Sequence, residues 1–225
     1  MPHKKFFIIT LFLQFILLNL YAQEKLMWGG GIGMVVPDNG FGKIVSKKNP
    51  TIDDFGFATV ANPGINLNVG TLWMFNPRLS LLSELAYSYF PKDKKTWNSQ
   101  QYGDIKVNYQ MVNLSAQGNY YFSDQDIKPY LGAIFGLYYL RNYRDFNSSY
   151  ASNESVSITT NTLHAGYGAE FGFLVELSKI NYLQVGIRFS LIPDIEAEYI
   201  PEEDITINPH DKQNHWGLSA KLFFK

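Results

Sequence analysis

The sequence contains no cysteine, and this absence excludes several kinds of structure. None of its 225 residues is Cys, so the chain forms no disulfide, offers no thiolate to a metal and carries no lipidated cysteine. Exported domains often depend on disulfides for stability. If this protein is exported, its architecture alone must stabilise it.

Charged residues are also scarce. Asp, Glu, Lys and Arg make up 17% of the chain, against roughly 25% in ordinary soluble domains. The excess of one sign is small, because 19 basic residues face 20 acidic ones. This weak and mixed balance gives no reason to expect nucleic acid as a partner.

Long apolar runs are missing after the N-terminus. One run covers residues 6–20, follows Lys4 and Lys5, and precedes Tyr21-Ala22-Gln23. This layout predicts a signal peptide over residues 1–22 and a mature domain over residues 23–225. The alternative is a retained anchor, but about 15 residues are fewer than the roughly 20 that a spanning helix needs.

The rest of the chain alternates between two kinds of residue. In residues 163–177, LHAGYGAEFGFLVEL, every odd-numbered residue is apolar and most even-numbered ones are small or polar. A period of two is the signature of a strand whose two faces meet different environments. Eight strands are predicted, over residues 26–36, 64–75, 79–90, 105–122, 129–140, 158–177, 182–192 and 215–224.

The connections between these strands differ in length. Residues 76–78, 123–128 and 178–181 are short turns, and the four remaining connections are long and polar. Short and long connections alternate, so all long loops share one side, as in outer-membrane barrels. The sequence therefore predicts an all-β fold: an eight-stranded antiparallel transmembrane β-barrel, monomeric and exported to the outer membrane.

Alternation alone also fits a soluble barrel of the lipocalin kind, with its apolar face inward. Here the polar set carries mostly Gly, Ser and Ala with single charges, which suits a crowded interior better than a water-facing surface. The apolar set carries no charge, as hydrocarbon requires. Aromatic residues near the strand ends predict two interfacial girdles: Phe75, Tyr121, Phe122, Tyr182 and Phe224 beside the short turns, and Tyr87, Tyr89, Tyr138 and Tyr139 toward the loops.

Four charged residues fall on the predicted inner face: Glu84, Glu170, Arg188 and Lys221. Each lies a few residues from a short turn or from the C-terminus, so their heights agree within roughly 10 Å at about 3.3 Å per residue. Unpaired charges there would be costly. We therefore expect a barrel-interior ion-pair network that fills the lumen, with a charge-lined ion constriction as the alternative.

The strand pair KPYLGAIFGLYYL (128–140) and HAGYGAEFGFLVELS (164–178) resembles the small outer-membrane barrels of the OmpA, OmpX and OmpW kind. The YAQ region and the overall length are similar to barrel proteins of Bacteroidota, including PorT-like ones. The closing WGLSAKLFFK resembles the signal that the barrel assembly machinery recognises, although it ends in Lys225. The resemblance implies a fold, a location among outer-membrane lipid and lipopolysaccharide, and that machinery as a partner.

Other candidate sites are weaker. His164, His210 and His215 lack the Ser two residues later that lipid A deacylases carry, so no catalytic residue is assigned. Glu202, Glu203 and Asp204 in the last loop are weak candidates for a divalent cation, but their spacing favours a solvated loop and no metal site or cofactor is assigned. Loop lysines are interpreted as surface charge, and GGGIG (29–33) lies within a strand and is no phosphate loop.

These features predict a non-enzymatic protein that binds a partner or surface through its extracellular loops, or supports an envelope complex. Two alternatives stay open at this point. One is a narrow channel for small solutes, and the other is a lipid A-modifying enzyme.

Overall fold

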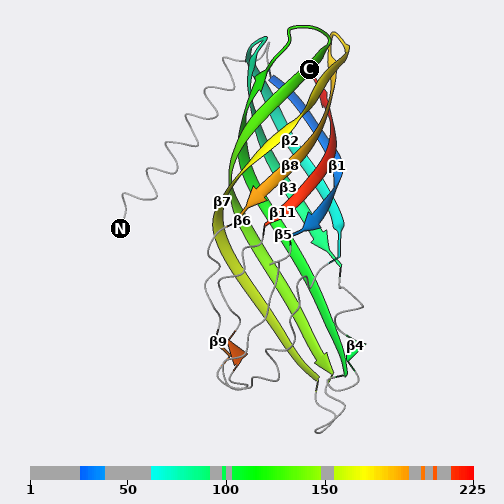
Figure 1. Cartoon of the computed structure of the whole chain (residues 1–225), viewed down its shortest axis with the longest axis vertical. Helices are drawn as coiled ribbons and strands as arrows, with labels where there is room; N and C mark the ends of the chain where they lie inside the picture. Colours follow the sequence, from blue (N-terminus) through cyan, green and yellow to red (C-terminus); the bar gives the residue numbers. More distant parts are fainter. Residues whose placement is uncertain are drawn as a thin grey trace, which may run out of the picture.

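The computed structural model describes residues 26–38, 62–91, 98–99, 103–147, 155–192, 199–200, 205–206 and 214–225 (Figure 1). The predicted signal peptide, His210, the acidic candidates Glu202, Glu203 and Asp204, and the loop lysines lie outside these residues. No helix in the described part of the chain is long and apolar enough to cross a membrane.

Eight long strands form a closed wall. They are β1 (Leu26–Pro37), β2 (Gly64–Asn76), β3 (Leu79–Phe90), β5 (Gly103–Tyr121), β6 (Ile127–Asn147), β7 (Ser155–Ser178), β8 (Asn181–Leu191) and β11 (His215–Phe224). Neighbours are antiparallel, and pairing of β1 with β11 and of β3 with β5 closes the ring. The predicted eight-stranded antiparallel barrel is confirmed. Three short strands, β4 (Asn98–Ser99), β9 (Tyr199–Ile200) and β10 (Ile205–Thr206), lie outside this wall.

The register of the ladders sets the tilt and width of the barrel. From Lys221, cross-strand pairs lead through β8 to Leu174 on β7. The opposite path, through β1, β2, β3, β5 and β6, reaches β7 at His164. The two end points are ten residues apart on β7 (174 − 164 = 10), so the strands are strongly staggered. Eight strands at this stagger leave an interior filled by side chains.

Apolar side chains cover the outside of the wall, as the alternation predicts. Ile32, Phe135 and Leu163 each expose more than 60% of their surface. The residues that alternate with these apolar positions along each strand face the lumen. GGGIG lies in β1, where Gly29 faces the Phe223 ring on β11. The run thus makes room at the seam that closes the barrel.

The turns at one end are tied together. Arg78, after β2, places its Nε 3.0 Å from Asp124 Oδ1, after β5, and its carbonyl oxygen accepts a bond from the Tyr121 backbone N–H at 2.8 Å. The hydrogen bond to Asp124 raises the pKa of the exposed Arg78 guanidinium above its ordinary value. This end is called the turn end below, and the opposite end the loop end.

Two strands are longer than predicted. β6 continues through residues 141–147, which the sequence pattern assigned to a loop, and β7 begins at Ser155 rather than at residue 158. Arg141 to Asn147 pair with Asn161 to Ser155, so the β6–β7 ladder runs on without a break. Figure 1 shows β5, β6 and β7 continuing past the end of the other wall strands. Backbone pairing sustains this extension where the apolar alternation has stopped.

The aromatic girdles are only partly as predicted. Phe75, Phe122, Phe224, Tyr87 and Tyr139 are exposed on the outer wall. Tyr121 and Tyr138, however, are buried in the lumen, and Tyr182 packs against buried side chains there. These three belong to the inward-facing set of their strands, which proximity to a strand end does not reveal.

The interior therefore has apolar layers as well as polar ones. At the turn end, a cluster called here the turn-end layer consists of Met27, Leu72, Leu82, Tyr121, Tyr130, Leu174 and Phe223. Toward the loop end, the His215 ring lies edge-on to Phe90 and to Tyr138, with centroids 6.0 and 6.4 Å apart. These three rings are called the loop-end layer. The sequence predicted a polar filling of ion pairs and hydrogen bonds, and the structure adds these apolar layers to it.

Candidate functional site

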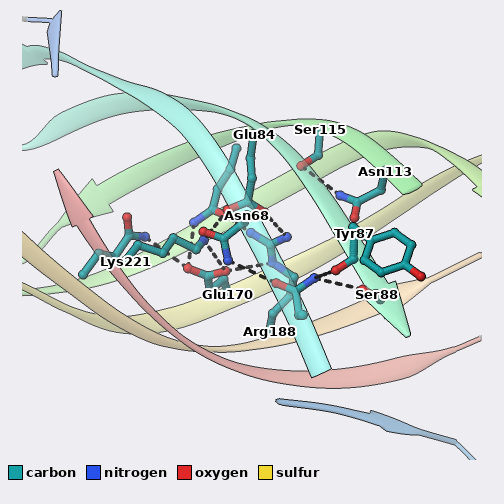
Figure 2. A network of polar contacts seen from close by, with 12 residues as sticks. Asn68, Glu84, Tyr87, Ser88, Asn113, Ser115, Glu170, Arg188 and Lys221 are labelled. Carbon is teal, nitrogen blue, oxygen red and sulfur yellow. Dashed lines mark hydrogen bonds and ion pairs between the residues drawn. The ribbon is translucent and has the colours of Figure 1, made fainter. Parts of the chain in front are cut away.

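Four strands deliver the charged side chains to the same level of the lumen. Glu84 comes from β3, Glu170 from β7, Arg188 from β8 and Lys221 from β11, each at an inward-facing position. Glu170 and Arg188 are direct cross-strand partners. Figure 2 shows all four side chains converging between the strands. The structure thus brings together the residues that the sequence predicted to meet.

Arg188 and Lys221 each contact both carboxylates. Arg188 Nε lies 2.8 Å from Glu170 Oε2, and its Nη1 lies 2.7 Å from Glu84 Oε1. Lys221 Nζ lies 2.7 Å from Glu84 Oε2 and 3.6 Å from Glu170 Oε2. Two acids and two bases balance, so the layer carries no net charge. We call these four residues the charged layer.

Burial makes this pairing necessary. The side chains of Glu84, Glu170 and Lys221 are at most 3% exposed, and that of Arg188 is 13% exposed. A single buried ion costs several kcal/mol when its partner is missing. When they are paired, the four ions neutralise one another and fill the lumen at their level.

Neutral side chains complete the bonding of Glu170. Its Oε1 accepts hydrogen bonds from Tyr130 Oη at 2.5 Å, Gln184 Nε2 at 3.1 Å and Gln117 Nε2 at 3.3 Å. Gln117 Oε1 in turn accepts a bond from Arg188 Nη2 at 3.0 Å. The charged layer is therefore held by three neutral residues as well as by its own ion pairs.

The hydrogen bonds continue toward the turn end. Gln117 Nε2 donates to Asn119 Oδ1 at 2.7 Å, and Asn119 Nδ2 donates to Ser80 Oγ at 3.1 Å. Ser80 Oγ and Tyr121 Oη are 2.9 Å apart. Because Tyr121 also belongs to the turn-end layer, the polar and apolar layers are joined into one packed interior.

Glycine leaves the space that this network fills. A Cβ placed on Gly186 of β8 would strike Tyr130 Oη and lie 2.8 Å from Glu170 Oε1. A Cβ on Gly132 of β6 would lie 2.8 Å from Gln117 Nε2. The small residues of the inner face are therefore required by the polar side chains opposite them.

The chemistry available to this arrangement is limited. Both carboxylates are paired with cations, and within the described residues no group of three or more His, Asp and Glu is placed to hold a metal ion. His164 faces the lumen opposite Tyr138, and His215 belongs to the loop-end layer. Within the described residues, the four charged side chains are arranged as an ion-paired plug.

Sequence reasoning missed Tyr130, Gln117 and Gln184. All three lie on the inward-facing set of their strands, so the alternation contained the signal. These residues carry no charge, but a buried carboxylate has lone pairs for several hydrogen bonds, which neutral donors can supply.

Similarity to known proteins is found among solved structures. No protein-family model matches the sequence, and no curated protein matches it. Among solved structures, Neisserial surface protein A (NspA) is 14% identical, with a TM-score of 0.48 over 89% of this chain and 96% of that one. The attachment invasion locus protein Ail of Yersinia pestis is 12% identical (TM-score 0.45; 89% and 98%). The outer membrane protease OmpT from Escherichia coli is 9% identical (TM-score 0.38; 89% and 96%). The fold assignment rests on the strand pairing described above.

Proposed function

We propose that this protein is a non-enzymatic, non-conducting outer-membrane barrel that binds an extended segment of a protein partner at its loop end. The apolar outer wall supports the membrane location, because soluble proteins rarely expose so large a contiguous apolar surface. In this setting the wall contacts outer-membrane lipid and lipopolysaccharide. The C-terminal strand β11, which pairs with β1 to close the ring, is the segment that the assembly machinery would recognise.

The filled interior argues against a channel. The turn-end layer, the charged layer and the loop-end layer follow one another along the lumen. In the charged layer, Arg188 on β8 reaches across the lumen to Glu84 on β3 at 2.7 Å and pairs with Glu170 on the neighbouring strand β7 at 2.8 Å. An ion crossing this layer would have to separate buried pairs, at several kcal/mol per ion.

The observation that carries the proposal is the extension of β5, β6 and β7 beyond the barrel. β7 first pairs with β8 at Tyr167, opposite Leu191. Between Ser155 and Gly166, β6 is the only strand that pairs with β7 among the described residues. Among the described residues, these twelve positions therefore have a strand partner on one side alone.

Three of the usual protections against pairing are missing from this strand. Natural sheets blunt exposed edges with charged residues, proline or bulges. The stretch SVSITTNTLHAG (155–166) contains no charged residue and no proline, and its ladder to β6 has no bulge. Such an edge suits a partner segment that adds as a further strand, held by main-chain hydrogen bonds.

A shortened variant tests this proposal. Residues 143–159 are replaced by a two-residue Asn-Gly turn, which joins the paired positions Asn142 and Thr160 and leaves the barrel wall intact. Peptides are selected from a random library on the full chain. We expect some to bind the full chain, to bind the shortened variant far less, and to slow amide exchange within residues 155–166. Peptides that bind both proteins equally, or protect other residues, would contradict the proposal.

Conductance in planar lipid bilayers tests the closed interior. We expect the full chain to show no steady current steps, with an open-channel porin as the positive control. Regular steps that depend on protein insertion would favour the narrow channel instead.

A further inference from the structure

A small cavity lies inside the barrel between the charged layer and the loop-end layer. Its volume is about 20 Å³, and its lining includes Glu84, Arg188, Tyr138 and Ser190. A cavity needs roughly 10–15 Å³ to admit one water molecule. The space therefore fits a single small occupant and excludes organic ligands.

Two buried hydroxyl groups at this cavity have no hydrogen-bond partner among the described residues. Tyr138 Oη and Ser190 Oγ lie near each other, yet neither makes a hydrogen bond of acceptable geometry, although the two residues are only 1% and 0% exposed. Leaving a buried hydroxyl without a partner is unfavourable, so native proteins rarely do so. Both hydroxyls face a space in which a partner fits.

Arg188 supplies a third group at the same cavity. Its guanidinium has five N–H donors, and its bonds to Glu170, Glu84 and Gln117 use three nitrogen atoms once each. Two N–H groups thus remain for another acceptor. A water molecule can accept from Arg188 while it bonds the two hydroxyls, which both donate and accept.

We propose that this cavity is a binding site for one ordered water molecule, which joins Arg188 to Tyr138 and Ser190. A water molecule fits better than an ion, because the charged layer is already neutral and an added ion would be buried without a counter-charge. Through Tyr138 the water links the charged layer to the His215 and Phe90 rings of the loop-end layer. It thereby completes the packing of the lumen.

Removing either hydroxyl should change the stability of the protein differently, depending on whether the cavity holds a water molecule or is empty. If the water is present, Ser190→Ala and Tyr138→Phe each lose a hydrogen bond, and each should raise the unfolding equilibrium constant about fivefold. If the cavity is dry, each variant loses an unsatisfied group and should be unchanged or more stable. Matched controls on the outer wall are Ser83→Ala and Tyr139→Phe, for which we expect no loss of stability.

A crystal structure of the full chain grown from a bromide solution identifies the occupant. One density peak within hydrogen-bond distance of Arg188, Tyr138 and Ser190, without anomalous signal, would support the water site. A bromide anomalous peak there would overturn it in favour of an anion site. An empty cavity, or a direct Tyr138–Ser190 hydrogen bond, would also overturn it.

Discussion

At the scale of single residues, Glu170 connects most of the interior. It accepts hydrogen bonds from Arg188, Tyr130, Gln184 and Gln117 and also lies near Lys221. With Lys221 included, these partners come from four strands besides its own, so the carboxylate is a cross-link between parts of the wall that are not neighbours. Its charge matters because two buried cations depend on it.

Neutralising this carboxylate should weaken the barrel strongly. Glu170→Gln keeps the side-chain shape but leaves Arg188 and Lys221 with one counter-charge between them. We expect the free energy of unfolding to fall by about 3–5 kcal/mol, measured by urea unfolding in lipid vesicles with tryptophan fluorescence. The control is Glu176→Gln, half-buried on the same strand and outside the network, which should change stability by about 0.5 kcal/mol or less. Equal effects of the two substitutions would contradict the role of the charged layer.

Two glycine substitutions compare the effect of an added methyl group on stability at the inner face and at the outer wall. Gly186→Ala places a methyl group against Tyr130 Oη and Glu170, so we expect a loss of about 1–3 kcal/mol in unfolding free energy. Gly118→Ala adds the same group on the outer wall, where a Cβ meets nothing within 4 Å. That variant should lie within about 0.5 kcal/mol of the parent. The same unfolding assay measures both, and a costly Gly118→Ala would show that the outer wall is not open there.

At the scale of elements, the three long strands differ from the other five. β5, β6 and β7 contain 19, 21 and 24 residues, whereas the remaining wall strands contain 10 to 13. About 9–11 tilted residues cross a bilayer. The length of the shorter strands thus matches a membrane span, and the longer strands exceed that length.

Amide hydrogen exchange tests whether this extension is a paired sheet. Residues 141–146 of β6 pair with β5 on one side and with β7 on the other. The facing residues of β7, 156–161, pair with β6 alone among the described strands. We therefore expect slower exchange in the β6 segment than in the β7 segment, measured by mass spectrometry of peptic fragments. Exchange in β6 as fast as in an unstructured peptide would show that the extension does not form.

At the scale of the whole molecule, the barrel is asymmetric along its axis. At one end, hydrogen-bonded turns lie next to the apolar turn-end layer. At the other end, the extended sheet lies beyond the aromatic loop-end layer. Outer-membrane barrels place short turns in the periplasm and long loops outside. The extension is therefore expected on the cell surface.

The absence of cysteine makes this orientation easy to measure. Asn147→Cys lies at the end of β6 in the extension, and Gln125→Cys lies in the turn before β6. With a maleimide reagent too large to cross the outer membrane, we expect intact cells to label only the first variant. Both should react after the membrane is permeabilised. Labelling of only Gln125→Cys in intact cells would reverse the proposed orientation.

The sequence by itself determined the features that depend on neighbours along the chain. Alternation gave the strand number and the direction of each face, and connection lengths gave the sidedness of the loops. The pairing of Glu170 with Arg188 was also predictable, because a short turn joins their strands and their register follows from it.

Only the tertiary structure decided which inward residues meet across the lumen. Arg188 Nη1 reaches Glu84, 104 positions away in the sequence, because the stagger of all eight strands brings β3 and β8 to the same level. The contacts within the apolar turn-end layer have the same origin. Each depends on register summed around a closed ring, and local periodicity in the sequence does not encode that sum.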